Sequence, residues 1–328
     1  MAALNSETKL AELHVHLGGA VDPAVMWEMA HTQGIRLPTK DYWKFVDMIT
    51  ENPKKPKDFD DYLLLFNWTE LIQSSPIAVE RSVYQTIAGA YRKNNITCLE
   101  LRFNPMKRNR NGEQDLDHIM MAAIRGLDRA SLEYPVKAGM IICLDRGFTY
   151  RQNEILVQKA LKYQSRGVIG LDIAGPRHKG FDYAAYRSLY RKARHAGLGL
   201  TVHTGEEEDY RSVMHVIESL EPDRIGHGIK SADNERAMEM LKGNGITLEI
   251  CPTSNISTGV VSGPNELKRI FSIFNARKIK YTINTDGPEM LVTHLRKEMA
   301  FLLDSGILTE ADLVRANRRA FAASFIKG

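Results

Sequence analysis

Short apolar runs alternate with longer amphipathic segments along most of the chain. Eight of the apolar runs have the length and composition of buried strands, at residues 12–16, 97–103, 136–144, 168–174, 198–203, 224–226, 246–250 and 280–284. Apolar residues recur with helical spacing between the later runs, at residues 115–133, 151–165, 182–196, 209–219, 233–243 and 264–276. Strands that alternate with helices pair in parallel, so the pattern predicts an α/β fold, a closed (β/α)8 TIM barrel.

A long helical stretch interrupts this alternation after the first strand. It contains helix-like segments at residues 22–31, 41–50, 58–73 and 76–93. Asp22 followed by proline is a helix-start signal, because Asp caps the free N–H groups and proline fits the first turn. We expect residues 21–95 to form a helical insert, or lid, within a single domain of residues 1–328. Tyr62 and Phe66 lie one turn apart there and either face a flat apolar ligand or pack in the core.

Composition narrows the class of protein. The formal net charge is only +4, without a basic arm, which gives little support for a nucleic-acid or membrane partner. Cys98, Cys143 and Cys251 are odd in number and lie in apolar runs, which indicates buried thiols in a reducing compartment, by default the cytoplasm. An open doubly wound sheet is the nearest alternative fold, but no Gly-x-Gly-x-x-Gly follows the first strand.

Polar residues with metal-binding chemistry stand where the predicted strands end. In a (β/α)8 barrel the active site lies at this end of the strands. His14 and His16 flank one valine and therefore face the same side of the first strand. His203 ends the fifth strand, and Asp286 follows the eighth. Three histidines and a carboxylate suit Zn²⁺ or another divalent transition metal, with one position left for water.

Glu206 and His227 lie on the same predicted rim and are candidates for the reacting groups. A metal ion lowers the pKa of its bound water from about 15.7 to about 7. His227 would orient or deprotonate that water, and Glu206, if kept protonated, would give a proton to a ring nitrogen. The alternative for Glu206 is a surface residue in the acidic run 206–209.

Six short motifs, taken together, carry a family resemblance. They are His14-Val-His16, Gly170-Leu-Asp-Ile-Ala-Gly175, His203-Thr-Gly-Glu206, Arg224-Ile-Gly-His227-Gly, Ile250-Cys-Pro-Thr-Ser-Asn and Asn284-Thr-Asp286. In this order they resemble the adenosine deaminase family of the amidohydrolase superfamily. The resemblance implies one Zn²⁺ per chain, a small-molecule purine substrate, and a 6-oxopurine and ammonia as products. The resemblance also implies roles for single residues. The metal ligands would be His14, His16, His203 and Asp286, and Asp286 would also orient the water. Glu206 would give a proton to purine N1, His227 would assist the attacking hydroxide, and the Gly175 N–H would meet purine N3.

Two departures from the family pattern concern the substrate. Members that act on adenosine usually carry aspartate at the positions of Gly18 and Gly287, where it holds the ribose 5′-hydroxyl and purine N7. The loss of both contacts predicts an altered substrate preference. An enzyme discriminates strongly between substrates when a polar group of its site is left unpaired by the wrong one, and both of these polar groups are missing here. Gly18 would leave room for a larger group, which suggests a 5′-modified adenosine.

Basic residues after two of the predicted strands suggest that the 5′ group of the substrate is anionic. Lys107, Arg108 and Arg110 follow the second strand, and Arg177 follows the fourth. They would contact a phosphate or carboxylate on the substrate, as in adenosine monophosphate or aminodeoxyfutalosine, or they are solvated loop charges.

Other classes of function remain as alternatives. A binuclear hydrolase would need a lysine in strand 168–174, which has none, and the His-x-Glu and Pro-Cys-x-x-Cys motifs of cytidine-type deaminases are absent. A non-catalytic nucleoside-binding barrel would not need the complete set of ligands and reacting groups.

Overall fold

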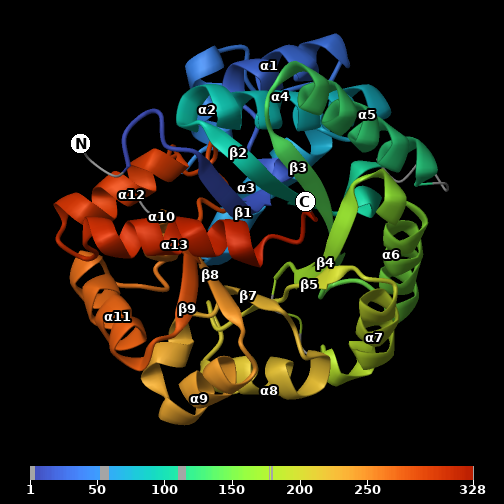
Figure 1. The fold of residues 1–328 in the computed structure, drawn as a ribbon. Coiled ribbons are helices and arrows are strands. Elements are labelled where there is room, and N and C mark those ends of the chain that lie inside the picture. The colour runs from blue at the N-terminus through green and yellow to red at the C-terminus, as the bar shows by residue number, and fades with distance from the viewer. Residues whose placement is uncertain (1–3, 52–58, 110–115, 177, 179, 328) are drawn as a thin grey trace.

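The computed structural model describes residues 4–51, 59–109, 116–176, 178 and 180–327. Figure 1 shows a central ring of strands surrounded by helices. The strands are β1 (Leu10–His16), β2 (Ile96–Phe103), β3 (Lys137–Asp145), β4 (Val168–Ala174), β5 (Gly199–Leu200), β6 (His203–Thr204), β7 (Arg224–His227), β8 (Thr247–Ile250) and β9 (Lys280–Ile283). They pair in parallel as two sheets, β1-β2-β3-β4-β5 and β6-β7-β8-β9.

Two seams join these sheets into a barrel. The predicted strand 198–203 is split into β5 and β6, and the two residues between them bind both neighbours. The backbone N–H of Thr201 donates to β4 at 2.9 Å, and the carbonyl of Val202 accepts from β7 at 2.9 Å. At the other seam, Asp286 exchanges backbone hydrogen bonds of 2.7 and 3.0 Å with His16 and His14 of β1. The predicted (β/α)8 barrel is therefore confirmed, with its fifth strand divided.

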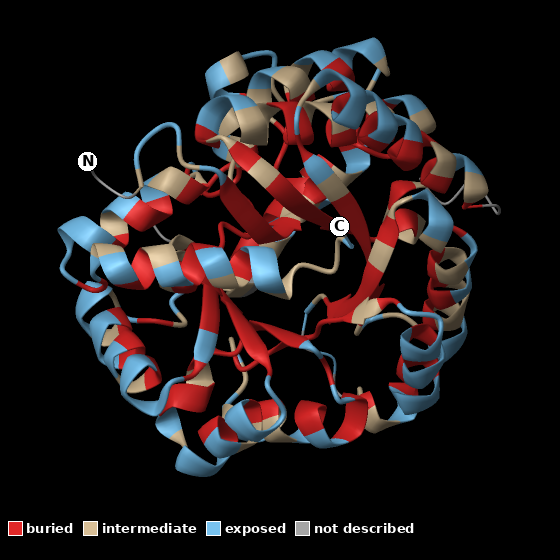
Figure 2. Cartoon of the chain, viewed as in Figure 1, coloured by how far each residue is buried: buried red, intermediate tan, exposed pale blue. Residues whose placement is uncertain are grey.

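The predicted crossover helices all form. They are α5 (Asp117–Glu133), α6 (Tyr150–Lys162), α7 (Arg187–His195), α8 (Tyr210–Leu220), α9 (Glu235–Gly243) and α11 (Pro264–Arg277). Figure 2 shows why the sequence pattern predicts them, since each helix is buried on the face toward the strands and exposed on the other. Short helices occupy several loops, namely α10 (Pro252–Ser257) and the 3-10 turns Leu17–Gly19, Pro105–Arg108, Gln164–Arg166, Tyr183–Tyr186 and Ile229–Asp233.

The region after β1 contains four helices, as predicted. They are α1 (Pro23–Thr32), α2 (Tyr42–Ile49), α3 (Phe59–Ile72) and α4 (Pro76–Asn94). Asp22 caps α1 by accepting the N–H of Ala24 at 2.9 Å. Helix α4 packs against α5 and β2 and belongs to the outer ring, so α1 to α3 are the additional elements. Of these, α3 contacts the turn Leu17–Gly19 and therefore covers the carboxyl end of β1.

Two helices that the sequence pattern left unassigned follow β9. They are α12 (Leu295–Asp304) and α13 (Glu310–Ala323), and α13 covers the seam between β1 and β9. The chain then crosses the barrel end that faces the viewer in Figure 1. There the Phe325 ring lies over Gly199, where a Cβ atom would come within 2.1 Å of it, and under the Arg224 guanidinium at 3.6 Å. Only glycine fits this close approach.

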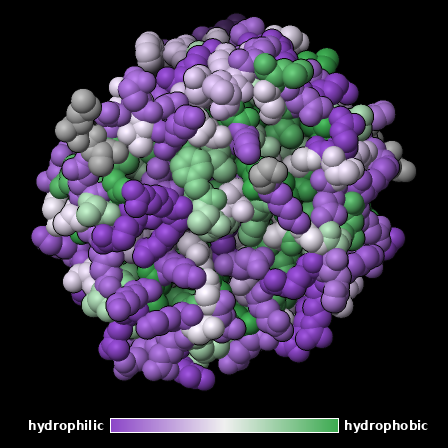
Figure 3. Space-filling view, viewed as in Figure 1, coloured by the Kyte–Doolittle hydropathy of each residue, from purple (hydrophilic) through white to green (hydrophobic). Residues whose placement is uncertain are grey.

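The outer surface and the three cysteines match what the composition predicts, namely few apolar areas outside and buried thiols inside. The face in Figure 3 is mostly hydrophilic, with separate small apolar areas. Within the described residues, no helix is both long enough and apolar enough to cross a membrane. Cys98, Cys143 and Cys251 are all buried and unpaired, as predicted.

Candidate active site

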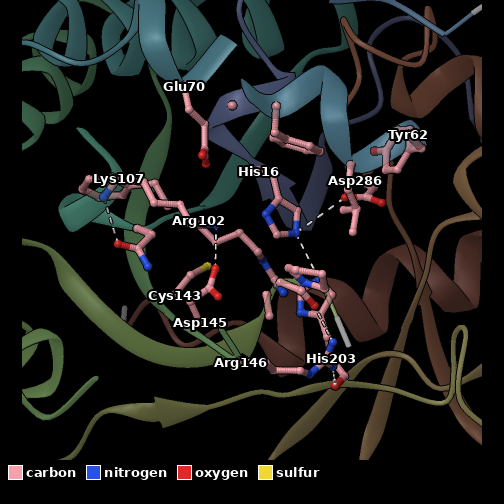
Figure 4. Close-up of a pocket in the computed structure, with 18 of the residues that line it drawn as sticks. His16, Tyr62, Glu70, Arg102, Lys107, Cys143, Asp145, Arg146, His203 and Asp286 are labelled. Carbon is pink, nitrogen blue, oxygen red and sulfur yellow. Dashed lines mark hydrogen bonds and ion pairs between the residues drawn. The ribbon is translucent and has the colours of Figure 1, made fainter. Parts of the chain in front are cut away.

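Three histidines converge at the carboxyl ends of β1 and β6. The Nε2 atoms of His16 and His203 are 3.0 Å apart, and the rings of His14 and His203 are centred 4.6 Å from each other. Figure 4 shows His16 and His203 facing one another at the wall of a cavity. Alternation along β1 places both of its histidines on the inner side, as the spacing predicts.

Asp286 completes this cluster from the segment after β9. Its Oδ1 lies 3.5 Å from Nε2 of His16 and 3.8 Å from Nε2 of His14, while Oδ2 accepts a hydrogen bond of 2.6 Å from Ser254. The backbone of Asp286 has a left-handed φ of 68°, which is uncommon for a residue other than glycine. Its backbone hydrogen bonds to β1 hold this conformation in place.

The cluster fits a divalent metal ion. The Nε2 atom of His14 is buried and has no hydrogen-bond partner within the described part of the chain, which leaves a lone pair directed at the cluster. His14, His16 and Asp286 each offer one ligand atom within 4.8 Å of the others, and His203 adjoins them. An orphaned imidazole nitrogen beside two more imidazoles and a carboxylate is the donor set of a transition-metal site.

Buried carboxylates orient two of these histidines, and the sequence reading missed both. Glu249 of β8 accepts a hydrogen bond from Nδ1 of His14 at 2.8 Å, and Asp172 of β4 accepts one from Nδ1 of His203 at 2.9 Å. Because a carboxylate can only accept, each Nδ1 carries the proton and each Nε2 presents its lone pair to the cluster. The available signal was an acidic residue inside each apolar strand.

Arg102 of β2 keeps these carboxylates charged. It donates to Asp172 at 2.9 Å and to Glu249 at 2.7 Å, and all three side chains are fully buried. Burial alone would raise the pKa of Glu249, but Arg102 and Arg224 hold it at about 2. Burial likewise opposes ionisation of Asp172, and His203 and Arg102 nevertheless hold its pKa well below the usual range.

Glu206 and His227 form the second predicted pair. Nε2 of His227 lies 3.5 Å from a carboxylate oxygen of Glu206 and 4.0 Å from Asp286, while the Asn255 amide contacts Nδ1 at 3.0 Å. Burial, and then the charge of Asp286, raise the pKa of Glu206 well above its usual value. The Glu206 side chain is only 12% exposed, so the surface alternative is wrong. This carboxyl group can hold a proton at neutral pH.

The histidine pKa values support a ligand role. Burial lowers the pKa of His14, His16 and His227 well below the usual value for histidine, and the charge of Arg102 adds to this effect. The imidazoles are therefore neutral near pH 7, which is the form that binds metal ions.

A cavity of about 380 Å³ opens above the cluster. Its wall includes Tyr62, Phe66, Glu70, Lys107, Arg108, Gly175, Glu206, His227 and Asp286. Tyr62 and Phe66 thus lie where a ligand would contact them, although Tyr62 also packs against Met290 and Leu291. The volume suits a nucleoside-sized ligand.

The three glycines named from the sequence differ in their surroundings. Gly18 lines the cavity, but a Cβ atom there would lie 2.8 Å from the Phe66 ring, so the expected spare room is occupied by that ring. Gly175 lines the cavity with a left-handed φ of 92°, backed by Asp145. Gly287 packs against the backbone of Gly19 and is not among the described residues that line the cavity.

Basic side chains form the opposite wall. Arg108 is only 1% exposed, so it is not a solvated loop charge, and its Nη2 atom lies 3.7 Å from Glu70. Lys107 pairs with Asp145 at 2.6 Å. Arg110 and Arg177 lie outside the residues that the structure describes.

Arg146 was not predicted from the sequence. Its guanidinium donates to the Gly175 carbonyl at 2.6 Å, to the His203 carbonyl, and to the Tyr183 hydroxyl at 3.1 Å. It therefore fixes two strand ends that carry site residues. A single arginine in a loop after β3 gives no sequence signal for this role.

The barrel and the site define a class of enzyme, a hydrolase built around a candidate metal centre. The family model described as "Adenosine deaminase" matches residues 9–328. The chain belongs to the adenosine deaminase family, and it is a hydrolase that acts on carbon–nitrogen bonds.

Relatives support this assignment over nearly the whole chain. An adenosine deaminase from Vibrio atlanticus is 30% identical over 314 residues, which cover 96% of this chain and 92% of the relative. An amidohydrolase structure from Burkholderia ambifaria with bound zinc has a TM-score of 0.86 at 21% identity, covering 98% of this chain and 87% of that one. The N6-methyl-AMP deaminase of Arabidopsis thaliana has a TM-score of 0.83 at 23% identity, covering 98% and 93%.

Proposed function

We propose that the protein hydrolytically removes the 6-amino group of an adenine-containing nucleoside, either adenosine or a 5′-modified derivative, and yields a 6-oxopurine and ammonia. One observation carries this proposal. Glu206, a carboxyl group with a raised pKa, stands beside His227 and Asp286 at the end of a cavity large enough for a nucleoside. Such a carboxyl group can protonate a ring nitrogen while water attacks the adjacent carbon.

The resident ion in this proposal is one Zn²⁺, held by His14, His16, His203 and Asp286. When bound, the ion would supply hydroxide at neutral pH by lowering the pKa of a bound water to about 7. Glu206 delivers a proton to N1 of the purine. His227, held by Asn255, and Asp286, held by Ser254, orient the attacking water toward C6. The Gly175 N–H donates to N3 in this proposal, which its place in the cavity wall supports.

A second observation favours a substrate with an anionic tail. Nε and Nη1 of Arg108 are buried beside the cavity and have no hydrogen-bond partner in the described ranges, and the same is true of Nδ2 of Asn104. Buried N–H groups without acceptors are rare, and a carboxylate or phosphate would satisfy them. The N6-methyl-AMP deaminase among the structural neighbours acts on a molecule with such a tail.

Ammonia release from a panel of nucleosides tests both statements. We expect turnover of adenine nucleosides, with kcat/KM at least tenfold higher for adenosine 5′-carboxylate or 5′-phosphate than for neutral 5′-methylthioadenosine. Arg108→Gln should remove this preference, and Arg108→Lys should restore part of it, because lysine keeps the charge. If no adenine nucleoside released ammonia, the proposed function would be refuted. A preference for plain adenosine would refute the proposed preference for a substrate with an anionic tail.

A further inference from the structure

The hydroxyl group of Tyr62 is buried and has no hydrogen-bond partner among the residues that the structure describes. The side chain lines the cavity from α3, and the residue is only 4% exposed. A buried hydroxyl without a partner loses its bonds to water and gains nothing in exchange. Such a group in a cavity wall calls for an acceptor that arrives with the ligand.

Tyr62 stands at the reacting end of the cavity. Its ring packs against Met290 and Leu291, a few residues after Asp286. Burial, and then the charges of Asp286 and Glu206, raise the pKa of its hydroxyl well above the usual value, so the group keeps its proton. Figure 4 shows Tyr62 on the side of Asp286, with Lys107 on the other side of the cavity.

The other described lining residues with buried, unpartnered N–H groups lie in a different part of the fold. The buried N–H groups of Arg102, Asn104 and Arg108 that lack partners all belong to β2 or to the turn after it. Arg146 donates to protein acceptors from Nε, Nη1 and Nη2. Gly287, beside Asp286, has no side chain to offer.

The chemistry of a 6-aminopurine identifies the acceptor. Two ring nitrogens flank the carbon that carries the amino group, with N1 bonded to it directly and N7 one atom further on the other side. Glu206 takes the N1 side under the proposed function. We propose that the Tyr62 hydroxyl donates a hydrogen bond to N7 of the bound purine and so selects rings that carry a nitrogen at that position. This inference rests on the proposed function.

A cycle of two proteins and two substrates tests the contact. Tyr62→Phe removes the donor, and 7-deazaadenosine, which has carbon in place of N7, removes the acceptor. We expect each single change to lower kcat/KM roughly tenfold, and the combined change to cost no more than either one. If 7-deazaadenosine were disfavoured equally by the wild type and by Tyr62→Phe, the contact would be excluded.

Binding measurements separate this result from the proposed function. In the Glu206→Gln variant, calorimetry with adenosine and 7-deazaadenosine should show the same roughly tenfold ratio of Kd values, and adding Tyr62→Phe should abolish it. This readout does not depend on turnover, so absence of ammonia release would refute the reaction and an unchanged Kd ratio would refute the role of Tyr62.

A matched control is Tyr190→Phe. This buried tyrosine donates to the Thr201 carbonyl at 3.0 Å and is not among the described lining residues. Its loss should leave the ratio between the two substrates unchanged. A ratio that collapsed equally in the control would assign the effect of Tyr62→Phe to general loosening of the fold and overturn the proposal.

Discussion

At the scale of the residue, the environment of Glu206 determines its chemistry. A free glutamate would be ionised at neutral pH, whereas burial and the charge of Asp286 raise the pKa of this one well above the usual value for glutamate. The same side chain in the acidic run 206–209 would otherwise pass for a surface residue. Its partner His227 has a left-handed φ of 58°, so the backbone at both this residue and Asp286 is in an uncommon conformation.

Glu206→Gln should lower kcat by about 10²–10⁴-fold, because glutamine cannot give the proton. In the wild type, kcat/KM should fall as pH rises through the raised pKa of Glu206, since only the protonated form donates. The variant should lose this dependence and keep its bound metal. Glu218→Gln, at an exposed position on α8, is the control and should retain activity. Full activity in Glu206→Gln would show that another group supplies the proton.

The residues that meet in the histidine cluster could be predicted from the sequence, and the buried carboxylates that orient them could not. His14, His16, His203 and Asp286 lie at or just beyond the carboxyl ends of recognisable strands, so the barrel rule brings them together. Asp172 and Glu249 lie inside strands, where a charged residue has no partner until the strand order and register are known. The same limit applies to Phe66, which fills the space beside Gly18 from another helix.

At the scale of the element, a buried ion network ties the strands to one another below the histidines. Glu249 of β8 pairs with Arg102 of β2 at 2.7 Å and with Arg224 of β7 at 2.7 Å. Burial would raise the pKa of Glu249, but the two arginines hold it at about 2, below the usual 4.5. Its contribution to stability is therefore present above about pH 4.5 and is lost as pH falls toward 2.

Glu249→Gln should reduce the free energy of unfolding by about 3–5 kcal/mol at pH 7, because Arg102 and Arg224 are both buried and each loses one of its two carboxylate partners. Urea denaturation of both proteins should show this difference shrinking as pH falls from 4.5 toward 2. Glu239→Gln, at an exposed position on α9, is the control and should change stability by less than about 0.5 kcal/mol. A difference that is constant between pH 7 and 3 would contradict the assigned ionisation.

Element boundaries show where sequence patterns stop being informative. Periodicity predicts the strands and crossover helices because each buries one face. It does not predict that the strand at 198–203 divides, because the division depends on which neighbours its residues bind. Helices α12 and α13 follow β9, after the alternating pattern of strands and helices has ended. The position of α13 over the seam between β1 and β9 therefore emerges only from the structure.

At the scale of the whole molecule, the two ends of the barrel differ in what they contain. Phe325 and Arg224 close one end, while the opposite end carries the histidines and the cavity under α3. The family relationship extends over residues 9–328 and so includes both ends of the barrel. The central claim is that the histidine cluster is a metal centre on which deamination depends.

The most direct test measures bound metal and ammonia release on the same samples of protein, as purified, after chelation, and after reloading with Zn²⁺. The proposed function predicts that release of ammonia and 6-oxopurine from an adenine nucleoside rises in proportion to occupancy, up to about one ion per chain. Chelated protein should be inactive and should recover on reloading. Undiminished ammonia release from metal-free protein, or none from fully loaded protein, would contradict the claim.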